Sequence, residues 1–207
     1  MAATAVRYLR SAGARGGTPV ETPVGPEVYE ALPAPALRAV GEDERPPVGA
    51  GEFRRVLGHF ASGVTVVTAV DADGPAGFAC QSFASLSLEP PLVVFMAGRT
   101  STTWPRIARA GRFCANVLGE EQGALCRGFA VSGADRFAGV TYRPAPVTGA
   151  PLLDGVAAWI DCTVEAVHTG GDHLIVVGRV EALDADEECA PLLFHRGRFG
   201  RLAGLDV

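Results

Sequence analysis

The sequence contains no lysine, because all eighteen residues counted as lysine or arginine are arginines. A phosphate-binding P-loop needs the lysine of GK[ST], and a pyridoxal phosphate enzyme needs a lysine for its Schiff base. A ligase that is adenylated on a lysine nucleophile needs one as well. The missing lysine therefore excludes these three chemistries.

The sequence also lacks the paired cysteine spacing of a cross-linked or zinc-binding protein. The five cysteines are odd in number, widely spaced and never form a CxxC pair. This usage fits neither a disulfide framework nor a zinc-binding knuckle, so we expect reduced, mostly buried thiols. The stretch HTGGDH (168–173) holds two of the four histidines without further ligands at suitable spacing, and we expect no metal site.

The chain also lacks a basic surplus and long apolar runs. Its formal net charge is -5, which argues against a surface that binds nucleic acid. No apolar run approaches the length of a membrane span, and the first twenty residues lack the apolar region of a secretory signal. We therefore expect a cytoplasmic protein with neither nucleic acid nor membrane as a partner.

The composition predicts one folded domain preceded by an N-terminal extension. Residues 1–50 are rich in proline, glycine and alanine and show no sustained periodicity, which predicts a flexible N-terminal extension. The remaining residues, 51–207, are long enough for one compact domain, and 48% of the whole chain is hydrophobic.

The first half of the domain predicts a helix followed by strands. Phe53, Val56, Leu57 and Phe60 recur at helical spacing and predict a short core-facing helix closed by Gly63. VTVVTAV (64–70) and the extended segment 76–88 flank the turn signal DADG, which predicts a hairpin. PPLVVFMA then predicts a strand that is apolar on both faces, with the prolines at its entrance.

The second half continues the pattern of strands and short helices. WPRIARAG predicts a brief helix, FCANVLG a strand, and EEQGALCRGFA a helix with its acids in the first turn. VAAWIDCTVEAVH and HLIVVGRVEAL flank the turn TGGD and predict a second hairpin. Many strands joined by hairpins, with only short helices, predict a mainly β fold: an antiparallel barrel with helical decoration.

Two polar stretches are candidates for ligand binding. In CQSFASLSL, small side chains would let a planar ligand lie against the backbone, although an ordinary half-buried strand has the same pattern. In GRTSTTWPRIARAG, a run of hydroxyls precedes a helix opened by Pro105. That run predicts a phosphate seat to which Arg99 or Arg106 adds charge; plain helix capping is the alternative and needs only one hydroxyl.

Together, several stretches resemble the flavin reductase family with the FMN-binding split-barrel fold: FASGVTVVTA, CQSFASLSLEPPLVVF, TSTT, FCANVLGEEQ, GDH and PLLFHRGRFG. The resemblance covers roughly residues 52–202. It implies an antiparallel split β-barrel that transfers hydride from NADH or NADPH to FMN or FAD. It also implies a homodimer and a partner flavin-dependent monooxygenase that receives the reduced flavin.

The resemblance also assigns residues to the site. It implies that Gln81, Ser82 and Phe83 lie along the isoalloxazine with Ser85 nearby, that Ser101, Thr102 and Thr103 hold the phosphate, and that Asn116 lines the same groove. It further implies that His173 is the catalytic residue and contacts the nicotinamide nucleotide, and that Arg198 and Phe199 help to form the pocket for this nucleotide. The family often has a tyrosine where this chain has Phe199.

Two other functions fit the same motifs. One is a flavin-binding module that has the same fold but no reductase activity, and that acts as a flavin carrier or sensor. The other is a related split-barrel oxidoreductase that acts on another small substrate. The reductase requires that His173 and Phe199 border an open space beside the flavin groove.

Overall fold

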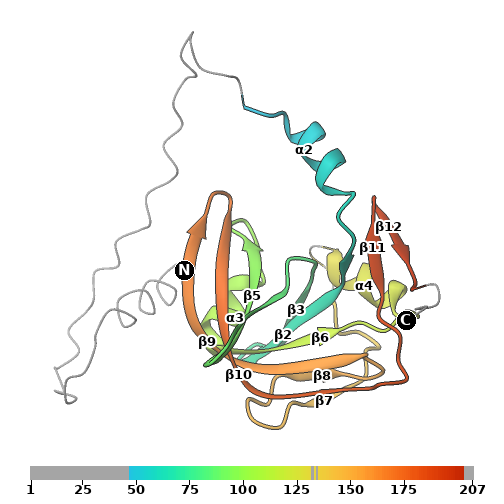
Figure 1. Ribbon diagram of the computed structural model, residues 1–207. Coiled ribbons are helices and arrows are strands. Elements are labelled where there is room, and N and C mark those ends of the chain that lie inside the picture. Colours follow the sequence, from blue (N-terminus) through green and yellow to red (C-terminus); the bar gives the residue numbers. More distant parts are fainter. Residues whose placement is uncertain (1–46, 132, 134, 203–207) are drawn as a thin grey trace, which may run out of the picture.

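A seven-stranded antiparallel sheet forms the body of the molecule (Figure 1). The computed structural model describes residues 47–131, 133 and 135–202. The strands lie in the order β3-β2-β6-β9-β10-β5-β4, and each neighbouring pair is antiparallel. They are β2 (Thr65–Asp71), β3 (Gly74–Cys80), β4 (Ala84–Leu88), β5 (Pro91–Gly98), β6 (Arg112–Val117), β9 (Ala158–Gly170) and β10 (His173–Ala185). The predicted mainly β fold and both predicted hairpins are confirmed.

Short helices and two small sheets surround this body. The helices are α2 (Ala50–Leu57), α3 (Trp104–Ala110) and α4 (Gly123–Ala130). One small sheet joins β1 (Ser62–Gly63), β11 (Leu193–His195) and β12 (Arg198–Gly200), and the other joins β7 (Tyr142–Pro144) and β8 (Pro151–Leu153). Of the helices in the described part of the chain, none is long and apolar enough to cross a bilayer. The helix α4 begins after the predicted acids, which precede its first turn.

The link between β3 and β4 brings the two edges of the sheet together. These strands follow each other in the sequence but lie at opposite edges of the sheet. Residues 81–83 connect them, and the Ser82 hydroxyl accepts from the Met96 N–H at 2.9 Å and donates to the Met96 carbonyl at 3.2 Å. The link is thereby tied to β5, which curls the sheet towards a barrel. The prediction of one extended segment over 76–88 is wrong, since the chain turns at 81–83.

Two buried apolar clusters hold the elements together. The first packs α3 on the sheet, and the rings of Phe95 and Phe113 meet edge to face with centroids 5.1 Å apart. Gly178 on β10 leaves room for the Phe113 ring, because a Cβ there would lie 2.4 Å from the ring. The second cluster joins α4 and β8 to the sheet through Phe129 and Leu153. Most of the β-rich body is therefore closely packed.

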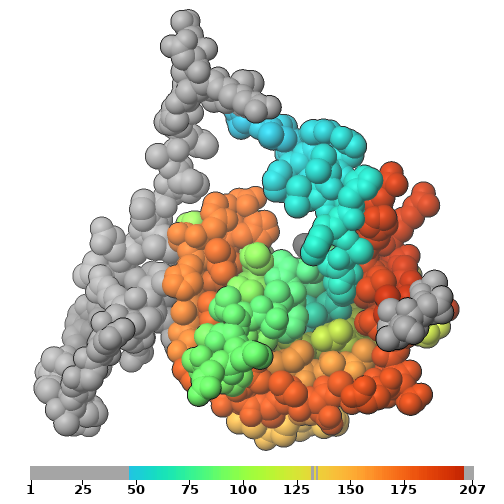
Figure 2. Space-filling view, viewed as in Figure 1, coloured from blue at the N-terminus to red at the C-terminus, as the bar shows by residue number. Residues whose placement is uncertain are grey.

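The helix α2 does not contribute to this core. The apolar stripe predicted to face it is exposed: the exposed fraction is 57% at Phe53 and 80% at Phe60, and no residue of the helix is buried. The helix also ends at Leu57, with Gly58 rather than Gly63 as its C-cap. Figure 2 shows α2 (cyan) standing away from the barrel. The prediction of a core-facing helix is wrong, because helical spacing reports an apolar stripe and not what covers it.

Candidate active site

A cavity of about 780 Å³ opens where β3, β5, the start of β10, α4 and the β11–β12 hairpin meet. In Figure 2 this face of the molecule is hollowed between the orange β9–β10 hairpin and the α2 region. Five of the predicted site residues line the cavity, although they come from three distant parts of the chain: Gln81, Ser82, His173, Arg198 and Phe199. The fold therefore brings the predicted flavin and nicotinamide residues to one space.

The wall formed by β3 and β5 is apolar and close to the backbone. Phe78, Ala79 and Met96 line it, and Gln81 is exposed at its end. The Ser82 hydroxyl faces the same cavity but is engaged with Met96 and lies 3.2 Å from the Cys80 sulfur. Ser82 therefore shapes this wall by holding the link against β5.

Phe83 and Ser85 lie outside the cavity lining. Phe83 is partly buried against the core cluster that contains Phe95. Ser85 is exposed on β4, opposite Val93, and a register shift follows it. The turn at 81–83 and this irregularity take both side chains away from the place that the resemblance implied.

Asn116 does not line the cavity either, so that assignment is corrected. Its exposed fraction is 0%, and its Nδ2 donates to the carbonyl of Val66 and to the Thr68 hydroxyl. Its Oδ1 accepts from the Leu153 N–H at 2.8 Å. The side chain is thus a buried cross-link between β2, β6 and β8, since a buried amide needs internal partners.

His173 begins β10 on the other side of the cavity, paired with Gly98 of β5. Its Nδ1 lies 2.8 Å from Asp172 Oδ1, and this hydrogen bond lowers the pKa of the Asp172 carboxyl. About half of the His173 side chain is exposed. The contact with Asp172 orients the ring and leaves Nε2 available to a ligand.

The third wall comes from α4 and the β11–β12 hairpin. The Phe199 ring meets the Phe194 ring edge to face at 5.6 Å, and the guanidinium carbon of Arg127 lies 5.4 Å from the Phe199 centroid. Arg127 and Cys126 line the cavity from α4. The sequence analysis missed these two residues. The one local signal for Arg127 is its i, i+4 spacing from Gly123, which places both residues on the face of α4 that contacts Phe199.

The predicted hydroxyl run borders a second cavity of about 320 Å³. Ser101 caps α3, because its hydroxyl accepts from the N–H groups of Thr103 and Trp104 at 3.3 and 3.1 Å. Thr102 and Thr103 line the cavity together with Arg136. The capping alternative therefore accounts for Ser101, while the two threonines face the space where a phosphate was expected.

The cation beside those threonines is Arg136, which the sequence analysis did not single out. Its Nη1 donates to the Thr103 hydroxyl at 2.6 Å and to the Gly77 carbonyl at 2.7 Å, and its burial lowers its pKa. Arg106 also borders the cavity but is bound to Asp71 at 2.6 Å. The Nε of Arg136 donates to the nearby Val131 carbonyl at 2.8 Å, but Thr103 and Gly77 are far away in the sequence, so no local pattern could place Arg136 beside the threonines.

The cysteines are free thiols, as predicted, and four of the five are buried. Burial raises the pKa of Cys114 to about 12 and also raises the pKa of the Cys80 and Cys126 thiols beside the cavity. A raised pKa disfavours the thiolate, which is the reactive form. Burial therefore disfavours the reactive form of the two thiols that line the cavity, Cys80 and Cys126.

Comparison with known proteins identifies the class of protein. The sequence profile described as "Flavin reductase like domain" matches residues 57–203. The reductase subunit HsaB of a flavin-dependent monooxygenase from Rhodococcus jostii is 52% identical over 147 residues, which cover 71% of this chain and 75% of that protein. An NADH:FMN oxidoreductase from Rhodococcus erythropolis is 37% identical over 180 residues, covering 85% and 90% of the two chains.

Solved structures agree with these relatives. Nitrilotriacetate monooxygenase component B from Mycobacterium thermoresistibile is 48% identical with a TM-score of 0.71, over 74% of this chain and 86% of that chain. The NADH:FAD oxidoreductase SgcE6 from Streptomyces globisporus is 34% identical with a TM-score of 0.71, over 82% and 100%. The chain belongs to the flavin reductase family and has its split-barrel fold. It is an NAD(P)H-dependent flavin reductase that uses a flavin and a reduced nicotinamide cofactor.

The residues of the site fit a flavin. A volume of about 780 Å³ lies within the usual range of cofactor pockets, and the β3–β5 wall is apolar enough for a ring system. The backbone at 81–82 and the exposed Gln81 amide offer donors and acceptors to the ring edge. The polar cavity with Thr102, Thr103 and Arg136 adjoins the same strand β3 and suits a phosphate.

Proposed function

We propose that the isoalloxazine of FMN or FAD binds along the β3–β5 wall, and that the nicotinamide of NADH or NADPH enters from the side of His173 and Phe199. The observation that carries this proposal is that Gln81, Ser82, His173 and Phe199 line one cavity. The flavin supplies the redox chemistry by accepting a hydride from the nicotinamide. The chain's own contribution is orientation: it holds two flat rings in contact and excludes water between them.

We assign the flavin phosphate to the smaller cavity. Ala76 and Gly77 line that cavity, while Phe78 to Cys80 line the larger one, so β3 runs past both. The four residue-to-residue steps from Gly77 on β3 to Gln81 just after it span about 13 Å at ~3.3 Å per step, which leaves room for a ribityl chain. Arg136 and Thr103 would then hold the phosphate at the far end.

We further propose that the reduced flavin leaves for a partner flavin-dependent monooxygenase. The support is the kind of protein to which the relatives belong: HsaB is the reductase subunit of such an enzyme. Both cavities are open to the surface, which suits a flavin that must dissociate after reduction. The free and mostly buried thiols support a reducing, cytoplasmic location.

We also propose a homodimer. The exposed apolar stripe of α2 and the edge strand β4, where Leu88 has an exposed fraction of 94%, are surfaces that a second copy would cover. Exposed apolar patches of this kind in small proteins usually mark an interface.

The alternative functions are less well supported. A binding module without turnover needs a pocket for the flavin alone, and the lining of the cavity by His173 and Phe199 as well as by the β3–β5 wall supports a site for two ligands. An oxidoreductase for another small substrate would need further polar groups beside the ring, and the β3–β5 wall carries mainly apolar ones.

The first experiment follows NADH and NADPH oxidation with FMN, FAD and riboflavin supplied in turn. We expect flavin-dependent oxidation and anaerobic bleaching of the flavin. Tight flavin binding without bleaching would instead establish the binding module. The absence of both flavin binding and NAD(P)H oxidation would refute the proposal.

The riboflavin arm tests the phosphate seat, because riboflavin lacks the phosphate. Arg136→Gln should weaken FMN binding by about tenfold, the value of one charge-assisted hydrogen bond, and leave riboflavin binding nearly unchanged. Arg143→Gln, an exposed arginine on β7, is the matched control. An equal loss for both flavins would assign Arg136 to the loop structure alone.

A further inference from the structure

Two arginines on the α4 and β12 side of the larger cavity have no acidic partner. Arg127 and Arg198 both line this cavity, and its lining contains no aspartate or glutamate. Within the described residues, neither arginine forms an ion pair, and the contact of Arg127 is with the Phe199 ring. Unpaired guanidinium groups are notable here, because the whole chain carries a formal charge of -5. This part of the cavity is therefore prepared for an anion.

The fold holds one of these cations in place. Gly123 and Arg127 are four residues apart and share a face of α4. A Cβ on Gly123 would lie 3.2 Å from Phe199 Cδ2, so the ring packs on the helix backbone because Gly123 has no side chain. The Arg127 guanidinium then lies 5.4 Å from the ring centroid, within the range of a cation–π contact. Arg127 is thus held at the cavity rim before any ligand arrives.

The flavin phosphate does not account for these two cations. That phosphate is assigned to the smaller cavity, where Arg136 and Thr103 face it. The hydride donor carries a second anionic group, the pyrophosphate that joins its two nucleosides. Arginine suits it well, since the planar guanidinium can donate two parallel hydrogen bonds to phosphate oxygens.

We propose that Arg127 and Arg198 bind the pyrophosphate of the reduced nicotinamide dinucleotide, while its nicotinamide reaches the side of His173. This inference rests on the proposed function, because it presumes that the dinucleotide enters this cavity. It makes both arginines determinants of dinucleotide affinity that take no part in the hydride transfer. FAD also carries a pyrophosphate, so the experiment must separate the two sources.

The test measures steady-state kinetics of Arg127→Gln, Arg198→Gln and the double variant with FMN as the flavin, so that NADH brings the only pyrophosphate. We expect the KM for NADH to rise about tenfold in the double variant with kcat within about twofold, because the contact is the same in ground and transition states. Replacement by lysine at both positions should restore part of the affinity. The KM for NADH should rise with salt in the wild type and less so in the double variant.

Two controls separate this effect from a structural one. Arg143→Gln removes an exposed arginine outside both cavities and should leave the KM unchanged. Reduced nicotinamide riboside carries no phosphate, and its KM should be nearly the same in the wild type and the double variant. An unfolding midpoint equal to that of the wild type would exclude a disturbed β11–β12 hairpin.

The possible results distinguish this inference from the proposed function. An unchanged KM for NADH in an active double variant overturns the inference and leaves the reductase intact. Weaker FAD binding with an unchanged KM for NADH also overturns it, because the arginines would then serve the flavin. If the wild type oxidises no NADH, the proposed function fails, and calorimetry with ADP-ribose then tests the arginine site by itself. Binding of ADP-ribose to the wild type that is lost in the double variant upholds the arginine site. No binding to the wild type refutes it.

Discussion

At the scale of single residues, several polar side chains of the predicted site bind the protein itself. Ser82 is bonded to the backbone of Met96, and Ser101 caps α3. Asn116 on β6 is fully buried and bonded to β2 and β8. These groups act by fixing the backbone around them.

Asn116→Ala tests this structural role. The substitution leaves the Leu153 N–H without its acceptor and removes the Nδ2 donor from the Val66 carbonyl, and a buried unsatisfied group costs about 1–3 kcal/mol. We expect the free energy of unfolding to fall by about 2–4 kcal/mol. Urea denaturation gives this value, and flavin fluorescence gives the flavin affinity of the folded fraction.

The comparison between the two measurements is decisive. Unchanged flavin affinity in the folded fraction agrees with the cross-link. A tenfold lower flavin affinity with an unchanged free energy of unfolding would instead show that Asn116 contacts the flavin.

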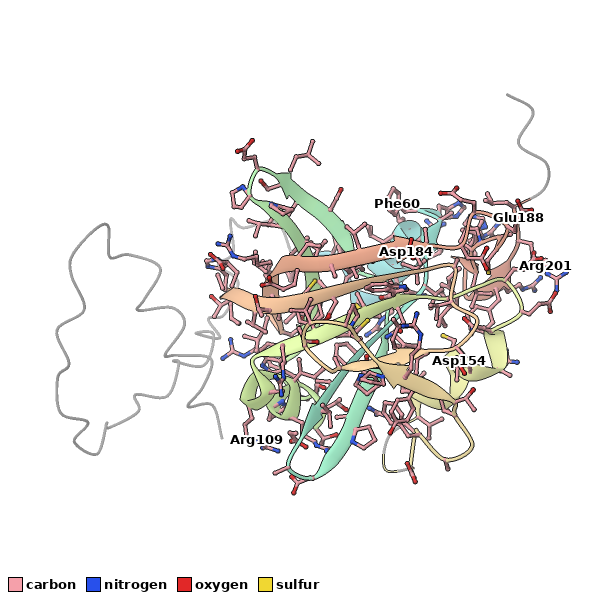
Figure 3. All side chains as sticks on the ribbon, turned by 90° about the horizontal axis from the view of Figure 1, so that it is seen from below. Phe60, Arg109, Asp154, Asp184, Glu188 and Arg201 are labelled. Atoms are coloured by element: carbon pink, nitrogen blue, oxygen red, sulfur yellow. The ribbon has the colours of Figure 1, made fainter. Side chains whose placement is uncertain are left out.

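At the scale of elements, an ion-pair cluster joins the tip of the β2–β3 hairpin to α3. Asp71 accepts from Arg106 at 2.6 Å and from Arg109 at 2.9 Å. Arg109, labelled in Figure 3, extends from α3 beside this hairpin. The hydrogen bond from Arg106 is the main reason why the pKa of Asp71 lies well below its usual range. The cluster fixes the helix next to the cavity that contains Thr102 and Thr103.

Asp71→Asn should therefore destabilise the protein in a pH-dependent way. Because the pKa of Asp71 is lower in the folded state, its contribution is present above the unfolded-state pKa of about 3.9 and is lost as the pH falls towards the folded value. We expect a loss of about 1 kcal/mol at pH 7, or ~2–4 °C in Tm. The difference from the wild type should shrink between about pH 5 and pH 2.

Thermal unfolding over this pH range measures the effect. Asp73→Asn is the control, since the Asp73 side chain is 75% exposed and lies 3.5 Å from Arg109. A constant difference between Asp71→Asn and the wild type at all pH values would contradict this account.

At the scale of the whole molecule, α2 and β4 leave an apolar surface uncovered. Phe53 and Leu57 have exposed fractions of 57% and 52%, and Leu86 on β4 has the same exposed fraction as Leu57. Figure 3 labels Phe60 beside α2, where it too is exposed. Such a surface costs free energy in water until another surface covers it.

The double variant Phe53→Glu, Leu57→Glu tests the proposed homodimer. Two charges placed in an apolar interface should raise the dimer dissociation constant at least about tenfold, since each would be buried without a partner. Sedimentation equilibrium of the full chain measures it. Arg54→Gln on the polar face of α2 should change nothing, and a monomeric wild type would refute the dimer.

Local sequence alone determined several elements of the second half of the domain. The apolar and β-branched runs, the TGGD turn, and the short helix opened by Pro105 all appear in the structure where they were predicted. These features depend on neighbours within a few residues, which is the range over which periodicity and turn preferences act. The predicted extension, residues 1–50, lies almost entirely outside the described residues and stays a prediction.

The tertiary structure decided which side chains meet a ligand. Gln81 and His173 reach one cavity because the link at 81–83 is tied to β5, and Phe199 joins them from the separate β11–β12 hairpin, whereas Ser85 and Asn116 are turned to solvent and to the core. Arg127 and Arg136 were missed because their partners, Phe199 and Thr103, lie far away in the sequence. The physical reason is that spacing along a strand or helix gives the face of a residue, while only the packing of distant elements determines what that face contacts.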